Sequence, residues 1–169
     1  WKMLKQILLF LAVFMILGCQ KMSSGLAPLK TDESYLQATR KTELIMQGNT
    51  QIVVIATHLN EFDWIKFPRE EGEIFFLDVY QTRKNGKGFL KNGYEIRLAN
   101  GTKPSKITRL KKEDLEGMIA QNATQWGEYY LVEFPKQDKR TQDRMILVLS
   151  HKDFGENTLE FGFKKIKKY

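Results

Sequence analysis

The stretch QIVVIAT (Gln51–Thr57) decides the fold class of this chain, and EIFFLDVY (Glu73–Tyr80) is a second run of the same kind. Both runs are short and dominated by β-branched and aromatic residues, which favour extended backbone. Continuous apolar runs of this length are typical of strands that are covered on both faces. The two stretches therefore predict the central strands of a β-rich domain.

Shorter patterns on either side of these runs predict the remaining elements. Tyr94–Leu98 alternates apolar and charged residues, as expected of a half-exposed strand, and it lies between the turn signals Asn92-Gly93 and Asn100-Gly101. A further turn signal is Asn85-Gly86. Other strands are predicted at residues 42–47, 105–110, 128–134, 144–150 and 158–163. One short helix is predicted over Lys111–Ala120 and a brief helical turn over Asp32–Ala38. Seven or eight strands with turns between them indicate an antiparallel β-sandwich.

One part of the chain resembles immunoglobulin-like domains. Lys106–Leu115, followed by Tyr129–Val132, is similar to the strand, helical turn and tyrosine-bearing strand of such domains. The resemblance implies an immunoglobulin-like sandwich and carries no functional residue with it. The chain departs from the family because its single cysteine cannot form the paired core disulfide, and because the gap between Asp114 and Tyr129 is longer.

The amino-terminal segment has the pattern of a secretory signal. Lys2 and Lys5 precede eleven uninterrupted apolar residues, Ile7–Leu17. As a helix this run covers about 16 Å, whereas a span of the bilayer needs about 20 residues. The length and the positive flank match the apolar region of a signal peptide.

The sequence Ile16-Leu17-Gly18-Cys19 resembles the lipobox of bacterial lipoproteins. The resemblance implies cleavage between Gly18 and Cys19, a diacylglyceryl group on the thiol and an acyl chain on the freed amine of Cys19. Two or more acyl chains give stable membrane anchoring. No other cofactor is expected.

These patterns predict three parts: a signal peptide at 1–18, a lipidated cysteine with a flexible tether at 19–30, and a sandwich domain at 31–169. Without Lys2 and Lys5, 25 basic residues stand against 20 acidic ones, a net charge of +5 that is scattered along the chain. In Gram-negative families, Gln20 in place of an aspartate after the cysteine favours the outer membrane. This order of signal peptide, lipidated cysteine and sandwich domain is similar to that of small sandwich-type lipoproteins of Gram-negative envelopes. We therefore expect a protein of the cell envelope, anchored in the outer membrane and facing the periplasm.

The chain carries no recognisable catalytic motif: it has no Gly-x-Ser-x-Gly, phosphate-binding glycine loop, His-Glu-x-x-His or cysteine pair. We therefore predict that it is not an enzyme and that it binds no metal. If strand ends converged, four residues would be the metal candidates: His58, Glu61, His151 and Asp153. Glu61 with Asp63, or Glu70 with Glu71, would be the candidate carboxylate pairs of a hydrolase. Solvated polar side chains at strand ends explain the same pattern more simply.

Large aromatic residues near loops are the best candidates for partner binding. Trp64 and Phe67 stand out because they lie in the long polar stretch from Glu61 to Glu71. Trp126, Tyr129 and Tyr130 are weaker candidates.

The predicted function is a non-catalytic structural or interaction role in the envelope, with the membrane and another envelope protein or polymer as partners. The basic tail Lys164–Tyr169 is read as a solvated terminus, although it could touch anionic lipid. Nucleic acid is not expected as a partner of an exported protein. The alternative is a metal-dependent or carboxylate hydrolase acting on envelope polymers. A small-ligand carrier is disfavoured because the strands are bulky enough to fill the core.

Overall fold

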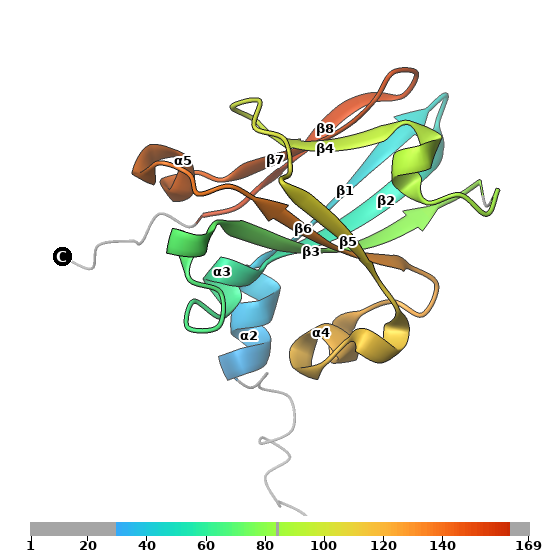
Figure 1. The fold of residues 1–169 in the computed structure, drawn as a ribbon. Helices are drawn as coiled ribbons and strands as arrows, with labels where there is room; N and C mark the ends of the chain where they lie inside the picture. Colours follow the sequence, from blue (N-terminus) through green and yellow to red (C-terminus); the bar gives the residue numbers. More distant parts are fainter. Residues whose placement is uncertain (1–29, 84, 163–169) are drawn as a thin grey trace, which may run out of the picture. The chain divides into compact units, whose positions relative to one another are not determined.

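The computed structural model describes residues 30–83 and 85–162, where eight strands form two antiparallel sheets (Figure 1). The first sheet has the order β1-β2-β3-β6-β5, with bounds Thr39–Met46, Asn49–His58, Glu73–Gln81, Glu128–Phe134 and Lys106–Leu110. The second has the order β4-β7-β8, with bounds Tyr94–Leu98, Ile146–His151 and Gly155–Glu160. The prediction of a mainly β, antiparallel fold is confirmed.

The chain divides into two compact units, Trp1–Thr31 and Asp32–Tyr169, and all strands of the described residues belong to the second unit. The predicted signal peptide, the lipobox with Gly18 and Cys19, the tether up to residue 29 and the basic tail lie outside the described residues. No helix within the described ranges is long and apolar enough to cross a membrane.

The two sheets meet along one side, where β1 lies beside β8. The Arg40 Nε donates a hydrogen bond of 2.9 Å to the Glu160 carbonyl oxygen, and the Asn157 amide donates one of 3.2 Å to the Glu43 carbonyl oxygen. These side chain to backbone contacts link the edge strands of the two sheets without a shared ladder.

The alternation of side chains along the strands makes two hydrophobic clusters. The larger cluster fills the space between the sheets and takes the alternate residues Ile52, Val54 and Ala56 of β2 with Phe75, Leu77 and Val79 of β3. The smaller cluster lies on the outer face of the five-stranded sheet, around Leu59, Phe76 and Tyr129. Both faces of β3 are therefore covered, as its continuous apolar sequence predicted.

Short helices cover part of that outer face, and they are more numerous than the single helix predicted. The α-helices are α2 (Lys30–Gln37), α3 (Leu59–Phe62), α4 (Gly117–Asn122) and α5 (Lys139–Asp143), and the 3-10 turns are η1 (Arg69–Glu71), η2 (Phe89–Asn92) and η3 (Lys112–Asp114).

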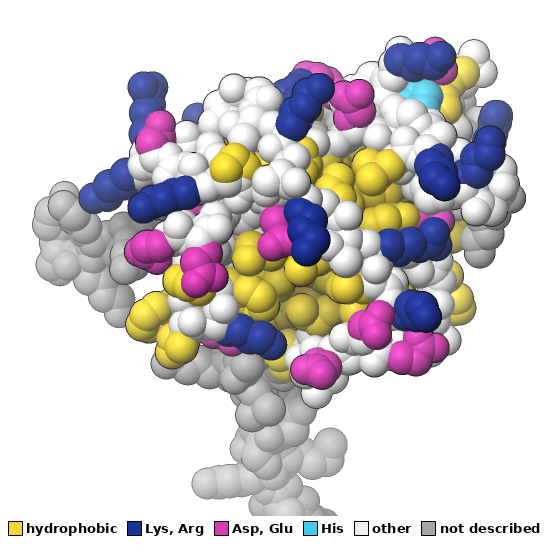
Figure 2. All heavy atoms as spheres, in the orientation of Figure 1, with side chains coloured by type: hydrophobic (Ala, Val, Ile, Leu, Met, Phe, Trp, Pro, Cys, Tyr) yellow, Lys and Arg dark blue, Asp and Glu magenta, His cyan; other side chains and the backbone are white. Residues whose placement is uncertain are grey.

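The helix predicted over Lys111–Ala120 is divided in the structure into η3 and α4. Leu115 and Glu116 between them are extended, and Leu115 packs on the outer cluster. Figure 2 shows apolar side chains gathered on this side of the domain, where β5 and α4 lie.

Candidate functional site

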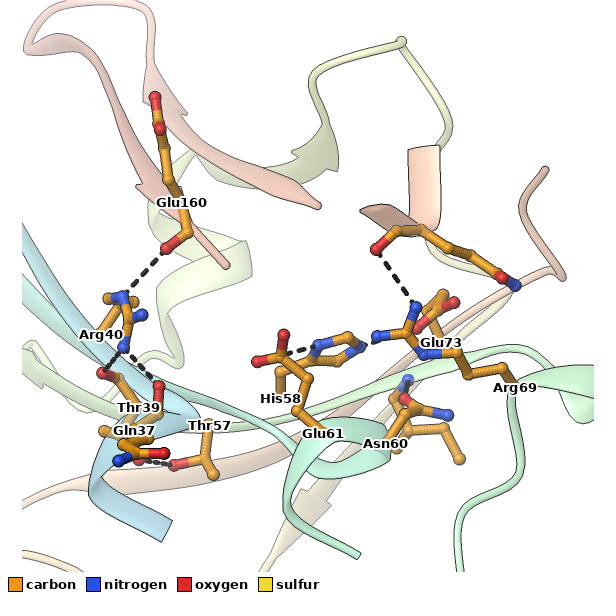
Figure 3. Close-up of polar contacts among 12 residues, drawn as sticks. Gln37, Thr39, Arg40, Thr57, His58, Asn60, Glu61, Arg69, Glu73 and Glu160 are labelled. Carbon is orange, nitrogen blue, oxygen red and sulfur yellow. Dashed lines mark hydrogen bonds and ion pairs between the residues drawn. The ribbon is translucent and has the colours of Figure 1, made fainter. Parts of the chain in front are cut away.

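Three charged side chains meet at the end of β2 (Figure 3). The Nε2 of His58 lies 2.7 Å from the Oε2 of Glu73, and its Nδ1 lies 3.6 Å from the Oε2 of Glu61. His58 and Glu73 have no exposed surface, while the Glu61 side chain is 19% exposed. The imidazole is therefore held between two carboxylates, one in the core and one at its edge.

Strand register explains why these residues meet. His58 continues the inward-facing series of β2 and pairs with Phe75 of β3, and Glu73 faces inward two residues before Phe75. The imidazole stacks on the Phe75 ring at a centroid distance of 4.6 Å. Glu61 is on α3, which begins directly after His58, so one helical turn brings its carboxylate back to the ring.

The charges of this cluster alter its acid–base properties. Burial disfavours a charged imidazole, but the two adjacent carboxylates outweigh it, so the pKa of His58 is raised. Burial likewise disfavours the Glu61 carboxylate, and the His58, Arg69 and Arg40 charges together lower the pKa of Glu61. Both directions favour an imidazolium paired with carboxylates.

The loop above the cluster is fixed by Asn60, which is buried. Its amide donates to the carbonyl oxygens of Phe67 and Gly72, and its Oδ1 accepts from the Ile74 N–H. Arg69, in the same loop, donates to the Gln142 carbonyl oxygen at 3.1 Å. The cluster is therefore surrounded by ordered backbone.

The burial of His58 and Glu73 assigns the cluster a structural role. A side chain without exposed surface cannot contact a substrate in this conformation, and the chemistry of an acid–base pair requires such contact. One oxygen of Glu73 has no hydrogen-bond partner within the described residues, and the other lies 2.7 Å from the His58 ring. The arrangement can order the β2–β3 connection and make its stability depend on pH.

The four metal candidates do not converge. Gln51 and His151 line the same small hollow, and Gln51 lies at the other end of β2 from His58. Gln51 and His58 are about 23 Å apart along β2, at ~3.3 Å per residue, so the hollow that His151 lines is far from His58. His151 and Asp153 form a local pair, in which the Asp153 N–H donates to the histidine Nδ1. Among residues 30–83 and 85–162, no group of three or more His, Cys, Asp or Glu side chains is placed to hold a metal ion.

A second arrangement lies on the outer face of the five-stranded sheet, where Asp78 holds the loop before β6. The Asp78 carboxylate, 4% exposed, accepts the Thr124 backbone N–H at 2.7 Å and the Thr124 hydroxyl at 2.9 Å. The Tyr129 hydroxyl donates to the Thr124 carbonyl oxygen. A Cβ at Gly127 would collide with the Asp78 carboxylate, so the loop passes this close only with glycine there.

This loop presents Trp126, which is 67% exposed, beside an apolar hollow. The hollow has a volume of about 440 Å³ and is lined by Lys41, Val53, Ile55, Asp78, Tyr80, Thr124 and Trp126, which we call the Trp126 groove. Its floor is β-branched, its walls are aromatic and its rim carries the Lys41 ammonium. The Trp126 groove thus combines an exposed aromatic ring with an apolar hollow, two features that are typical of interaction surfaces.

The two aromatic residues favoured from sequence occupy different environments. Trp64 is 71% exposed, whereas Phe67 packs against the outer hydrophobic cluster. Trp126 is a lesser sequence candidate that the structure places at the groove, and Tyr129 and Tyr130 are buried.

Glu73, Asn60, Asp78 and Thr124 were missed by sequence reasoning. A signal existed for Asp78, the one charged residue inside the apolar run of β3, where a buried carboxylate needs donors.

Comparisons of the chain with known protein families, with curated proteins and with solved structures find no match.

Proposed function

We propose that this protein is a lipid-anchored lipoprotein of the bacterial envelope, facing the periplasm from the outer membrane, with a non-catalytic binding role. Its binding surface is the Trp126 groove, and its partner there is another envelope protein. The proposal of the anchor and of the location depends on the lipobox resemblance at Ile16–Cys19 and on the short apolar run before it.

The observation that carries the binding role is the buried network beneath Trp126. Trp126 is 67% exposed beside an apolar hollow, and the buried Asp78 carboxylate anchors its loop through Thr124. Placing Asp78 in the sheet costs desolvation, which the Thr124 donors offset. An exposed tryptophan on a rigid loop loses little conformational entropy on binding, which is typical of interface hot spots.

The residues that line the groove indicate which chemical groups a binding partner would place in it. Val53 and Ile55 offer an apolar floor, and Tyr80 and Trp126 offer ring faces and edges. Lys41 is exposed at the rim and adds a positive charge. A protein segment with an aliphatic or aromatic side chain and a neighbouring carboxylate matches these features.

We also propose that the sandwich is of the immunoglobulin-like type. The order β2-β3-β6-β5 follows the A-B-E-D sheet of that fold, and β4-β7-β8 follows its C-F-G sheet. In this assignment β1 is an additional edge strand beside β2. In the same assignment Lys106–Leu115 covers strand D and the start of its connection to strand E, and Tyr129–Val132 lies on strand E.

Site-directed photo-crosslinking in living cells tests the binding role. A photo-crosslinking residue in place of Lys41 should give one reproducible adduct with an envelope protein, and the adduct should disappear when Trp126→Ala is added. The matched control is the same residue in place of Leu90, which is 41% exposed on η2 outside the groove and should give no such adduct. An adduct that is unchanged by Trp126→Ala, or no adduct from position 41, would contradict the proposal.

A further inference from the structure

The two most exposed large apolar side chains in the described residues are consecutive. Trp64 is 71% and Ile65 is 76% exposed, and both lie in the tight turn Asp63–Phe67, which we call the Trp64 turn. Figure 2 shows apolar side chains at the surface beside α3, the helix that leads into this turn. Neither residue belongs to the Trp126 groove.

The base of the Trp64 turn is rigid. The Asp63 carboxylate accepts the Lys66 N–H at 3.1 Å, and the Asp63 carbonyl oxygen accepts the Phe67 N–H at 2.9 Å. The Phe67 ring packs on the outer cluster, and its carbonyl oxygen accepts from Asn60. Trp64 and Ile65 are thus held away from the domain by a turn whose ends are anchored in it.

The turn carries the combination of side chains that suits a membrane–water interface. Tryptophan places an apolar ring and a polar N–H at the level of the headgroups, and an aliphatic neighbour adds apolar area. Lys66 lies beside them with its ammonium 5.5 Å from the centroid of the Phe67 ring, where it can reach a phosphate. The Asp63 charge is engaged at the base of the turn, away from its tip.

The place where the chain enters the domain brings this turn near a bilayer. The unit that carries the strands begins at Asp32, within α2 (Lys30–Gln37). The Tyr35 ring of α2 packs edge-on against Phe62, one residue before the turn begins, at a centroid distance of 5.2 Å. Ten residues, 20–29, span at most about 33–36 Å even when the chain is fully extended, which sets an upper limit on the distance between Cys19 and Lys30. If Cys19 is acylated, the turn is held within reach of the lipid surface.

We propose that the Trp64 turn inserts into the headgroup region of the bilayer that holds the acyl chains of Cys19. This inference rests on the lipid anchor of the proposed function. The short tether makes the second contact intramolecular, at an effective concentration in about the millimolar range, so even weak insertion is populated. The two attachments fix which side of the domain faces the membrane.

The experiment uses the mature protein purified from bacterial membranes and reconstituted into phosphatidylethanolamine–phosphatidylglycerol vesicles with or without brominated acyl chains. After cleavage before Cys19 the chain has two tryptophans, Trp64 and Trp126. Trp126→Phe leaves Trp64 as the reporter, and Trp64→Phe leaves Trp126 as the matched control. Intact-mass measurement of each sample reports acylation. Circular dichroism reports folding, which neither exposed position should disturb.

The expected result is an emission of Trp64 that shifts to shorter wavelength and is quenched by the brominated lipid, with Trp126 unaffected. Adding Ile65→Ser to the Trp126→Phe protein should reduce the quenching. Acylated protein whose Trp64 is not quenched, or is quenched no more than Trp126, would overturn this inference and leave the lipid anchor intact. Mature protein without acyl chains would overturn both.

Discussion

The imidazole of His58 and the carboxylate of Glu73 lie 2.7 Å apart between the sheets, and neither side chain reaches solvent. A buried ion pair of this kind contributes less to stability than its short distance suggests, because both groups lost their hydration. Loss of His58 would leave the Glu73 carboxylate buried without a counter-charge, whereas loss of Glu73 would still leave Glu61 beside the imidazole. The pair therefore couples the end of β2 to the start of β3.

Removing one partner should destabilise the protein strongly. We expect His58→Leu to lower the free energy of unfolding by about 3–5 kcal/mol, because the Glu73 carboxylate then stays buried without a counter-charge. Urea unfolding followed by circular dichroism measures the change.

The double variant His58→Leu with Glu73→Leu provides the control for that loss. Replacing both charges by apolar groups should recover most of the stability. Equal destabilisation by the single and double variants would show that packing, rather than charge, explains the effect.

Stability should also fall as the pH rises above 6.5 and through the raised pKa of His58. The pKa of His58 is raised above 6.5 because the two carboxylates outweigh the opposing effect of burial. The folded state then binds the proton more tightly than the unfolded chain. The contribution of the imidazolium is therefore complete below pH 6.5 and is lost as the pH rises through the raised pKa.

Glu61 should limit the stability of the protein at acid pH. Its pKa is lowered below 4.5, so its contribution is present above pH 4.5 and is lost as the pH falls through the lowered value.

The alkaline decline that His58 predicts can be measured by thermal unfolding between pH 4 and pH 9. The decline should appear in the wild type and not in His58→Gln. A decline of equal size in His58→Gln would assign it to other groups.

The loop that carries Trp126 should loosen without Asp78. Asp78→Ala removes an acceptor of two hydrogen bonds from Thr124, and bonds to charged groups contribute about 1.5–3 kcal/mol each. We expect lower stability and a lower fluorescence anisotropy of Trp126 in a Trp64→Phe background. Asp138→Ala is the matched control, since that carboxylate caps α5 and should leave the anisotropy unchanged.

Gly72 should tolerate no side chain. Its φ of +123° is in a region that favours glycine, and a Cβ there would collide with the Phe134 carbonyl oxygen. Gly48 also has a positive φ, of +75°, but a Cβ there would meet nothing within 4 Å. Gly72→Ala should therefore lower the melting temperature much more than Gly48→Ala. Similar losses would show that backbone strain alone, without the collision, sets the cost.

Much of the sheet could be predicted because each strand depends on local sequence. The bounds expected for Tyr94–Leu98 and Glu128–Phe134 match β4 and β6. The helix expected over Lys111–Ala120 is interrupted because Leu115 is drawn onto the sheet, a tertiary contact that helical periodicity cannot reveal.

The sites were harder to predict because they depend on which strand ends meet. His58 ends β2 and His151 ends β7, but these strands belong to different sheets, and His151 shares a hollow with Gln51 near the start of β2. The His58–Glu73 contact required the register of β2 on β3, and the Asp78–Thr124 contact joins residues that are 46 positions apart.

The most direct test of the account is metabolic labelling with a clickable fatty-acid analogue, followed by intact-mass analysis of the mature protein. A lipid anchor on Cys19 predicts label on the wild type, an amino terminus at Cys19 carrying acyl groups, and no label on Cys19→Ala. Label that persists in Cys19→Ala, or an unlabelled wild type, would contradict the lipid anchor on which the proposed function depends.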